Sequence, residues 1–296
     1  NFVKEAANAN AIRDQFVDKS NPQASDIYVP EVYPDLLSER LMISEWIDAV
    51  KLINTEEIKA GYNTTKMMQR LCECYGDQIF KYGAVHADPH AANVMVRAKP
   101  SHNKKKKYVD DPQVVLLDFG LCIQESAKFR YEYANFFKAI FTQDGDTLGK
   151  IAKEWGIGHV DLFASMQLMK PFKSKKKKAA AVVQETEGSV NKEATSSSSS
   201  LHAAPVHQQK VTKKEVMEMQ LMMKENARSL LEHDHLVPKE LIFVGRAMNI
   251  LRSVNKEFGG PVNRVNILVE RAVSALPYVA PLAVEETRLN GKSLVI

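Results

Sequence analysis

The sequence has few cysteines, no long uncharged apolar run and no methionine at its first position. Three cysteines, Cys72, Cys74 and Cys122, are too few for a disulfide framework and lack the spaced partners of a structural zinc site. No apolar run reaches the roughly 18 residues that a membrane span needs, and no signal peptide is visible. We therefore expect a reducing compartment. Because a helical pattern is already under way at Asn1, we also expect the chain to be truncated.

The sequence also has only a small excess of positive over negative charge. The formal net charge is +4 over 296 residues, and much of the excess lysine lies in two runs, 104–107 and 175–178. Lysine runs of this kind are usually solvated loops, so we expect no nucleic-acid partner. With 45% hydrophobic residues, the chain can form one sizeable core or a two-lobed domain.

Hydrophobic periodicity predicts two helices and two short strands in the first part of the chain. Apolar side chains spaced three and four apart predict a helix over 1–19 and another over 64–82, which Gly83 ends. Between the helices, β-rich runs at 27–33 and 41–47 predict short strands. The first run contains proline, which confines it to an edge or an irregular strand.

From about residue 127 onward, the pattern of apolar residues predicts helices, with two interruptions. Segment 173–212 is rich in lysine and serine and has few large apolar side chains, so it cannot offset its ordering entropy. We predict a disordered insertion there. Helical periodicity resumes near Lys214 and breaks at Gly259-Gly260-Pro261.

A polar loop over 86–93 leads from the second helix into a short strand over 94–97. A lysine-rich excursion follows, and the apolar run 114–117 returns as the partner strand. We expect the two strands to form a long-looped hairpin. The tripeptide Asp118-Phe119-Gly120 follows the second strand directly.

Three residues in these segments suit phosphoryl transfer, which needs an oriented nucleophile and metal ions that match the phosphate charge. Asp88 can accept or orient the attacking hydroxyl. Asn93, five residues later, and Asp118 can give oxygen ligands to magnesium. Each motif alone occurs by chance in unrelated proteins, and a polar turn beside a strand end is the plain alternative. Their order makes the signal specific, and we predict that the three side chains converge around a divalent cation.

Glu5 lies on the first predicted helix, where a kinase needs a glutamate to hold the lysine that grips the nucleotide phosphates. A glutamate on a helix surface is usually only solvated, and the later motifs favour the functional interpretation. His86 and His90 have the spacing of zinc ligands on a helix, but Pro89 between them opposes a helix. We therefore expect His86 to orient the loop backbone and His90 to lie near the phosphates.

At these residues the sequence resembles the AarF-domain-containing, UbiB-like family of atypical kinases, over nearly the whole chain outside the insertion. The likeness is carried by Phe2-Val3-Lys4-Glu5-Ala6-Ala7-Asn8, Val29-Pro30-Glu31-Val32-Tyr33, Glu39 to Glu45, His86 to Asn93 and Val115 to Gly120. The loop differs from ordinary protein kinases, which usually have His-Arg-Asp. In addition, Phe163-Ala164 and Gly260 to Arg264 look like the mitochondrial members of fungi and animals.

The resemblance implies an α+β, protein-kinase-like, two-lobed fold with a truncated N-lobe and a largely helical C-lobe. Residues 1–47 would form the partial N-lobe and hinge, and 48–172 the C-lobe with the catalytic loop and the metal-binding aspartate. The insertion at 173–212 and a helical C-terminal part of the C-lobe at 213–296 would follow.

The resemblance also implies a set of ligands and site residues. It implies binding of ATP and Mg2+, with ATPase activity or kinase activity on a small molecule or lipid. Glu5 would pair with the nucleotide-gripping lysine, and Glu45, Trp46 and Ile47 would form the hinge that meets adenine. A mitochondrial location, a possible inner-membrane surface and a link to coenzyme Q (ubiquinone) and lipid homeostasis are further implications.

The sequence departs from the family pattern in three places. The alanine-rich nucleotide loop, the lysine and the Lys-x-Gly-Gln segment precede the first helix in the family and are not part of this chain. Asn1 stands where members often have aspartate. Ala91-Ala92 replaces the usual Pro-Gly before the loop asparagine, which removes glycine's conformational freedom there.

Two alternative functions stay open at this point. One is a pseudokinase-type scaffold that binds nucleotide or lipid without turnover. The other is a small-molecule kinase of the aminoglycoside or choline kinase type, since these also place His and Asp two apart before an Asn. The long helical region after Asp118 fits the second alternative less well.

Overall fold

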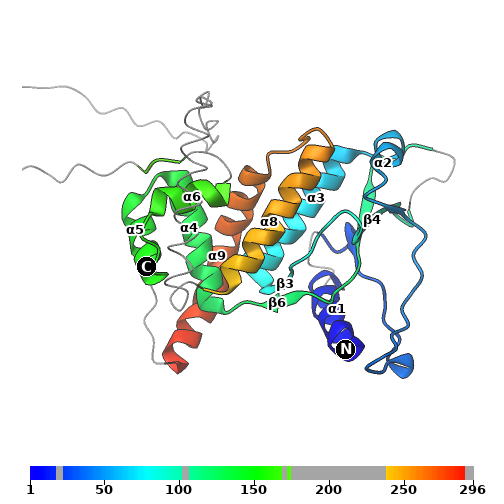
Figure 1. Ribbon diagram of the computed structural model, residues 1–296, viewed down its shortest axis with the longest axis horizontal. Coiled ribbons are helices and arrows are strands. Elements are labelled where there is room, and N and C mark those ends of the chain that lie inside the picture. Colours follow the sequence, from blue (N-terminus) through cyan, green and yellow to red (C-terminus); the bar gives the residue numbers. More distant parts are fainter. Residues whose placement is uncertain (18–22, 102–106, 169–171, 175–237, 291–296) are drawn as a thin grey trace, which may run out of the picture.

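The computed structural model describes residues 1–17, 23–101, 107–168, 172–174 and 238–290. It is a mixed α+β structure with two small sheets, in which α4, α5 and α6 lie at one side of the molecule and β4 lies with α2 at the other (Figure 1). The expected α+β class is therefore confirmed, whereas the division into two lobes at residue 47 stays a prediction. Most of the predicted insertion and the helical pattern over 214–237 lie outside the described residues.

The first helix, α1, spans Phe2–Val17, as predicted. The side chain of Asn1 caps it, because Oδ1 accepts hydrogen bonds from the backbone amides of Val3 at 3.0 Å and Lys4 at 3.3 Å. One face of α1 is buried, and its apolar members are Ala6, Ala9, Ile12 and Phe16. The helical spacing singled out these positions and also Phe2, whose side chain is exposed in the structure.

The two strands predicted near the N-terminus are mostly absent from the structure. The first shrinks to β1, Ile27–Tyr28, which pairs in parallel with β5. Residues 41–47 are all described, and they form no strand but one isolated bridge between Ser44 and Val32. The prolines around Val32 explain this, because proline has no amide hydrogen to extend a ladder.

The second predicted helix is confirmed with a change in its last turn. After the short helix α2, Thr55–Gly61, helix α3 spans Thr64–Asp77 and continues as a π-helical turn, η2, over Gln78–Tyr82. Gly83 ends it at a φ of 84°, a left-handed conformation that glycine adopts without strain.

The predicted long-looped hairpin is confirmed. Strands β4, Val94–Ala98, and β5, Pro112–Leu116, pair antiparallel, and β2, Val50–Lys51, joins the outer edge of β4. The sequence did not predict the second sheet, in which β3, Ala84–His86, pairs antiparallel with β6, Cys122–Gln124. Together the two pairings bring the loop after β3 next to the segment between β5 and β6.

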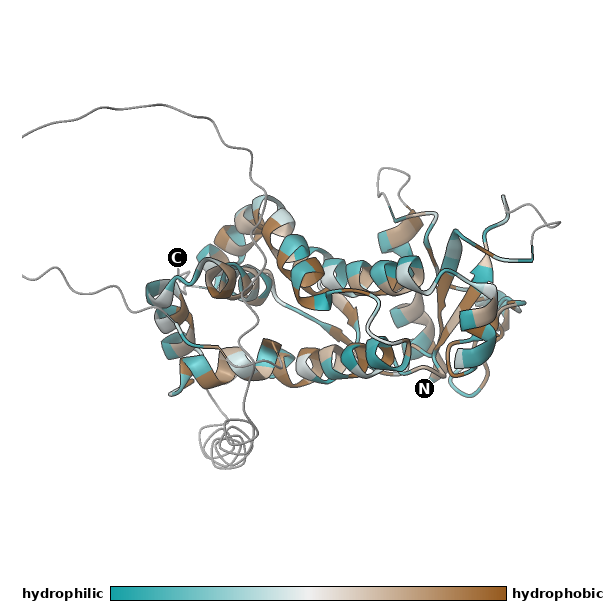
Figure 2. Ribbon diagram, turned by 90° about the horizontal axis from the view of Figure 1, so that it is seen from above, coloured by the Kyte–Doolittle hydropathy of each residue, from teal (hydrophilic) through white to brown (hydrophobic). Residues whose placement is uncertain are grey.

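The second half of the described chain is helical, as predicted. Its helices are α4 (Ala127–Thr142), α5 (Gly145–Glu154), α6 (Val160–Leu168), α8 (Glu240–Glu257) and α9 (Arg264–Leu289). The break between the last two falls at Gly259 and Gly260, both in the left-handed region. Coloured by hydropathy, the helices carry both hydrophilic and hydrophobic stretches, as amphipathic helices do (Figure 2).

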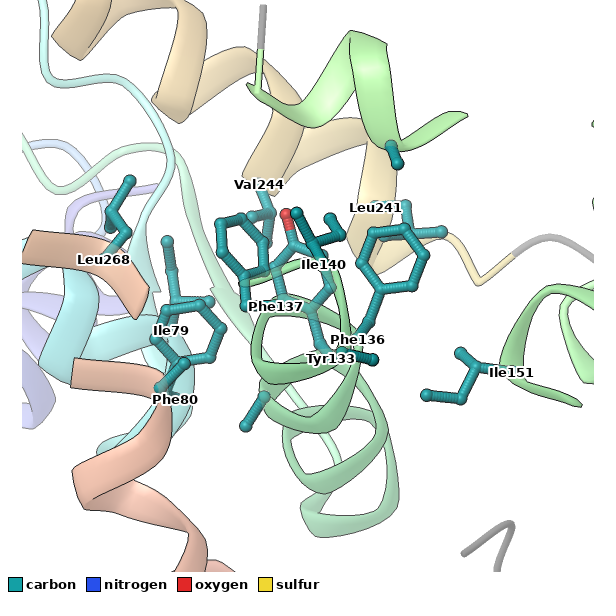
Figure 3. Packing of buried hydrophobic residues seen from close by; sticks show 14 of the residues in the cluster. Ile79, Phe80, Tyr133, Phe136, Phe137, Ile140, Ile151, Leu241, Val244 and Leu268 are labelled. Atoms are coloured by element: carbon teal, nitrogen blue, oxygen red, sulfur yellow. The ribbon is translucent and has the colours of Figure 1, made fainter. Parts of the chain in front are cut away.

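Two large clusters of buried apolar side chains make most of the core, and a small third cluster joins Ala127, Val279 and Ala283. The larger one gathers around α4, whose Tyr133 and Phe137 pack with Phe80 of η2 (Figure 3). Trp155 packs with Tyr133 and Phe136 of the same helix. The smaller cluster joins α1, α3 and the β4–β5 hairpin. Helix α8 contributes side chains to both clusters.

Helix α9 corrects one expectation from the sequence. By length and composition this helix could cross a membrane. It contains no unbroken apolar run of 18 residues, because Glu270 and Arg271 interrupt its most apolar stretch. In this structure 33% of that stretch is buried, and the helix packs along α3 and α4. Core helices of soluble proteins pass the same test, so α9 alone does not indicate a membrane span.

Candidate functional site

His86 connects the polar loop to the segment that carries Asp118. Its ring is buried, and Nε2 lies 2.6 Å from the carbonyl oxygen of Asp118 and 3.1 Å from that of Leu117. Nδ1 lies 2.8 Å from the hydroxyl of Tyr75. Because a carbonyl can only accept, Nε2 carries the proton and Nδ1 accepts from the tyrosine. Burial lowers the pKa of His86, which keeps the ring neutral.

Backbone hydrogen bonds hold the same two segments together. The amide of Leu117 donates to the carbonyl of Asn93 at 2.8 Å, and the amide of Ala87 donates to the carbonyl of Leu121 at 2.9 Å. The expectation that His86 orients the loop backbone is thus met. The loop over 86–93 and the segment that begins at Asp118 form one unit.

Asp88 is three-quarters buried and lies between two basic side chains. Its Oδ1 is 3.0 Å from Nη2 of Arg246 on α8, and its Oδ2 is 3.8 Å from Nε2 of His90. Its side chain is 23% exposed, so a molecule at the surface can still reach the carboxylate.

Asn93 is buried, and a hydrogen bond fixes its amide. Nδ2 donates to the carbonyl oxygen of Asp88 at 3.3 Å. With the nitrogen engaged by the loop, Oδ1 is the atom left to bind a cation, because the two amide atoms point in opposite directions. Magnesium binding by Asn93 stays a prediction.

Asp118 has a φ of 59°, an uncommon conformation for a residue with a side chain. Its Oδ1 accepts from the amide of Gly120 at 3.2 Å. A Cβ added at Gly120 would lie 3.2 Å from that oxygen and 3.9 Å from Oε2 of Glu5, so glycine leaves room for two carboxylates. Burial, and then the charge of Asp118, raises the pKa of Glu5.

Asn8, on the same helix as Glu5, adds a direct contact between α1 and the segment that begins at Asp118. Its Nδ2 donates to the carbonyl oxygen of Phe119 at 2.8 Å. Cys122 lies near both carboxylates, and burial, followed by the charges of Glu5 and Asp118, raises its pKa to about 12. Its thiol is therefore protonated and unsuited to nucleophilic chemistry.

The predicted hinge consists of residues 45–47. Glu45 accepts a 2.5 Å hydrogen bond from the hydroxyl of Tyr28, Ile47 is buried, and the side chain of Trp46 is 91% exposed. Within the described residues, no hydrogen bond or ion pair joins residues 45–47 to Asp88, Asn93 or Asp118. Their contact with adenine stays a prediction.

The donor set fits magnesium bound together with a nucleotide. Within the part of the chain that the structure describes, no group of three or more His, Cys, Asp or Glu could hold a metal ion. Magnesium needs few protein ligands, because it keeps waters and binds substrate phosphates. A carboxylate from Asp118 and an amide oxygen from Asn93 match that requirement, whereas a structural zinc or calcium site would need more ligands.

A separate surface hollow of about 400 Å3 lies between α5 and α6. Its lining residues are Gly149, Ala152, Lys153, Gly156, Ile157, Gly158 and Val160. None of them belongs to the constellation around Asp88 and Asp118. We therefore assign no nucleotide to this hollow.

Sequence reasoning missed four residues that shape the site, namely Asn8, Tyr75, Gln78 and Arg246. Asn8 stands in a segment that carried the family resemblance, so its position could have been noted. Gln78 accepts from the backbone amide of His86 at 3.0 Å. Arg246 is 158 residues from Asp88 along the chain, and no local pattern pairs residues so far apart.

A mixed α+β domain with an aspartate loop, an asparagine and a strand-ending aspartate brought together is a kinase-like domain. A family model described as the ABC1 atypical kinase-like domain matches residues 1–152, which is half of the chain. The chain therefore belongs to the ABC1 family of atypical kinases, the AarF-domain-containing, UbiB-like group.

Relatives with curated names agree with this assignment. The chain is 31% identical to ABC1 family protein lscO of Purpureocillium lilacinum over 93% of its length and 44% of the relative. It is 29% identical to a probable serine/threonine-protein kinase, abkD, of Dictyostelium discoideum over 93% of its length and 34% of the relative. AarF domain-containing kinase 1 of Drosophila melanogaster is 28% identical over 58% of the chain and 32% of the relative. The chain thus spans less than half of each.

Proposed function

We propose that this chain is the magnesium- and ATP-binding part of an atypical kinase or ATPase. The observation that carries the proposal is the hydrogen bond of His86 to the Asp118 backbone, which holds the loop of Asp88 and Asn93 against the metal-binding segment. Kinase-like names among the relatives support the same class. This chain spans less than half the length of each of these relatives, so the activity of a whole relative is carried over to this chain only as a proposal.

Each residue of the constellation has a distinct task in this proposal. Asp88 orients the attacking hydroxyl or water and accepts its proton. Asn93 and Asp118 hold magnesium, which, when bound, neutralises charge on the phosphates. Glu5 faces Asp118 from α1 and is placed to receive a lysine that grips the nucleotide. The hinge over Glu45, Trp46 and Ile47 would meet adenine.

We propose further, from the family resemblance alone, that the protein works in mitochondria. A link to coenzyme Q and lipid homeostasis, with a small-molecule or lipid substrate near the inner membrane, follows from the same resemblance. The family match favours this proposal over a relationship to the aminoglycoside and choline kinases.

The decisive experiment measures magnesium-dependent ATP turnover and ATP affinity in the native protein and in Asp118→Asn and Asn93→Ala. We expect Asp118→Asn to weaken nucleotide binding more, because a charge pair is worth about 4 kcal/mol and a neutral hydrogen bond about 1 kcal/mol. Arg252→Gln, at an exposed position on α8, is the control. Turnover that is unchanged in Asp118→Asn would contradict the proposal.

One observation favours a second candidate, a pseudokinase-type scaffold that binds nucleotide or lipid without turnover. Oδ1 of Asp88 lies 3.0 Å from Nη2 of Arg246, so a guanidinium already occupies one of the two oxygens that would receive the proton of the attacking group. ATP that raises the melting temperature without forming ADP would support this candidate, because a ligand that binds only the native state stabilises it.

A further inference from the structure

Helix α8 holds its side chains in a fixed orientation, because its buried face is anchored in both core clusters. Leu241, Val244 and Met248 belong to the larger cluster, and Leu251, Val254 and Phe258 to the smaller one. The opposite face is exposed and carries Ile242, Arg246 and Asn249 at helical spacing. Arg246 therefore projects from a rigid support toward the catalytic loop.

Arg246 contacts Asp88, the carboxylate that we propose to orient the attacking hydroxyl. Its Nη2 lies 3.0 Å from Oδ1 of Asp88. Within the described residues it makes no hydrogen bond to Asn93 or Asp118, the residues assigned to the metal and the nucleotide. The guanidinium thus contacts Asp88 without contacting the residues assigned to the metal.

Most of the hydrogen-bonding capacity of Arg246 is available to a second partner. A guanidinium has five N–H donors, and the contact with Asp88 engages one nitrogen. The side chain is 54% exposed, and a Cβ added at the neighbouring Gly245 would meet no atom within 4 Å. One turn away, Ile242 is 68% exposed and offers an apolar surface beside the charge.

We propose that Arg246 binds the anionic group of the phosphoryl acceptor, and that the acceptor is a hydroxyl compound which already carries a phosphate. This inference rests on the proposed function, and it names the substrate class of the same site. The planar fork of arginine matches two phosphate oxygens, so it can hold the phosphate while the hydroxyl faces Asp88. Arg246 lies outside residues 1–152, the part matched by the family model.

The test is equilibrium binding of glycerol 3-phosphate to the native protein without ATP, with glycerol as the uncharged comparison. Arg246→Gln should weaken glycerol 3-phosphate binding about tenfold or more, because it removes a charge-assisted hydrogen bond. Arg246→Lys keeps the charge without the fork and should show a smaller loss. Arg252→Gln, further along α8 and also exposed, is the matched control and should bind as the wild type does.

A second arm identifies the source of the phosphate. Vesicles of phosphatidylglycerol, whose headgroup has both phosphate and hydroxyls, are compared with vesicles of phosphatidylcholine, whose headgroup has no hydroxyl. Binding to phosphatidylglycerol that depends on Arg246 assigns a lipid acceptor. Dependence seen only with glycerol 3-phosphate assigns a soluble one, and both results support the inference.

Three results would overturn the inference. The first is that the wild type binds neither glycerol 3-phosphate nor phosphatidylglycerol vesicles. The second is that Arg246→Gln and Arg252→Gln weaken glycerol 3-phosphate binding equally. The third is that Arg246→Gln raises ATP turnover and leaves glycerol 3-phosphate binding unchanged. If Arg246→Gln does not fold, Arg246→Lys decides, and wild-type affinity in that variant would count against the inference. Because glycerol 3-phosphate binding is measured without ATP, a protein that binds it but does not turn over ATP would contradict the proposed function and still support the anion site at Arg246.

Discussion

At the scale of single residues, the contacts of His86 show how a buried polar group can position a site. The ring is satisfied on both nitrogens, by Tyr75 on one side and by two backbone carbonyls on the other. A neutral imidazole that donates once and accepts once fixes the distance between two segments of the chain. A charged imidazole would have two donors and would lose the bond from Tyr75.

Tyr75→Phe should therefore weaken both stability and nucleotide binding. The change leaves Nδ1 of His86 buried without a donor, which costs about 1–3 kcal/mol. Urea unfolding and ATP affinity measure the two effects. Tyr133→Phe is the control, because it removes the 2.8 Å hydrogen bond from a buried tyrosine to Gln167 away from the site. If both variants lower ATP affinity equally, the positioning role of His86 is wrong.

Asp77, at the C-terminal end of α3, gives a pH dependence of stability. Burial raises the pKa of Asp77 from its ordinary value of 3.8 to about 6, despite the opposing charge of Arg271. Its protonated form is thus favoured in the folded state. The corresponding stability is fully present below about pH 4 and is lost as the pH rises through about 6.

Asp77→Asn should remove this loss. The free energy of unfolding of the variant, relative to the wild type, should rise by about 2–3 kcal/mol between pH 4 and pH 7. Other buried acids such as Glu125 titrate in both proteins and cancel in the difference. Urea unfolding at the two pH values measures it, and a difference that does not change with pH would contradict the assignment.

At the scale of elements, an ion-pair network connects β1, α3 and the β4–β5 hairpin. Arg70 of α3 lies 3.0 Å from Asp26 and also contacts Asp111. Lys99, after β4, contacts the same two aspartates at 2.5 Å and 2.9 Å. Arg70 and Lys99 are each 13% exposed, so water screens these pairs far less than pairs on the open surface.

Arg70→Leu should destabilise the protein by about 1.5–3 kcal/mol, because it removes a charged hydrogen-bond partner of the largely buried Asp26, which keeps Lys99. The free energy of unfolding in urea is the measurement. Lys59→Ala is the comparison, since its pair with Glu56 is exposed and should matter little. A loss no larger than that of Lys59→Ala would mean that the network does not hold the hairpin.

Elements with a long hydrophobic repeat could be predicted from the sequence, and very short ones could not. Helices α1 and α3 carry several turns of periodic apolar residues, and most residues of the hairpin strands are apolar. Strands of two or three residues, such as β2 and β3, contain too few positions to show a period. Their pairing is decided by partners distant in the chain.

The same limit applies to the site. Asp88, Asn93 and Asp118 stand in local motifs, so the order of residues along the chain is enough to single them out. The contact of Arg246 with Asp88 and that of Asn8 with Phe119 depend on how α8 and α1 pack. Periodicity predicts that those helices exist, but it does not give their neighbours.

At the scale of the whole molecule, the two core clusters share helices. The chain from α3 into η2 runs from the smaller cluster to the larger one, and α8 runs between them in the same way. Because these helices pack in both clusters, a loss of packing in one cluster also destabilises the other. We therefore expect the described part of the chain to unfold as one cooperative unit rather than as two lobes.

A core substitution in the smaller cluster tests this expectation with a probe in the larger one. Trp155 is buried and Trp46 is exposed, so in a Trp46→Phe background fluorescence reports the larger cluster alone. Leu71→Ala, in the smaller cluster, should cost about 2–5 kcal/mol. In a cooperative unit the urea midpoints from Trp155 fluorescence and from circular dichroism shift together. Independent lobes would instead leave the fluorescence midpoint where it was, because Trp155 would not sense a cavity in a separate core.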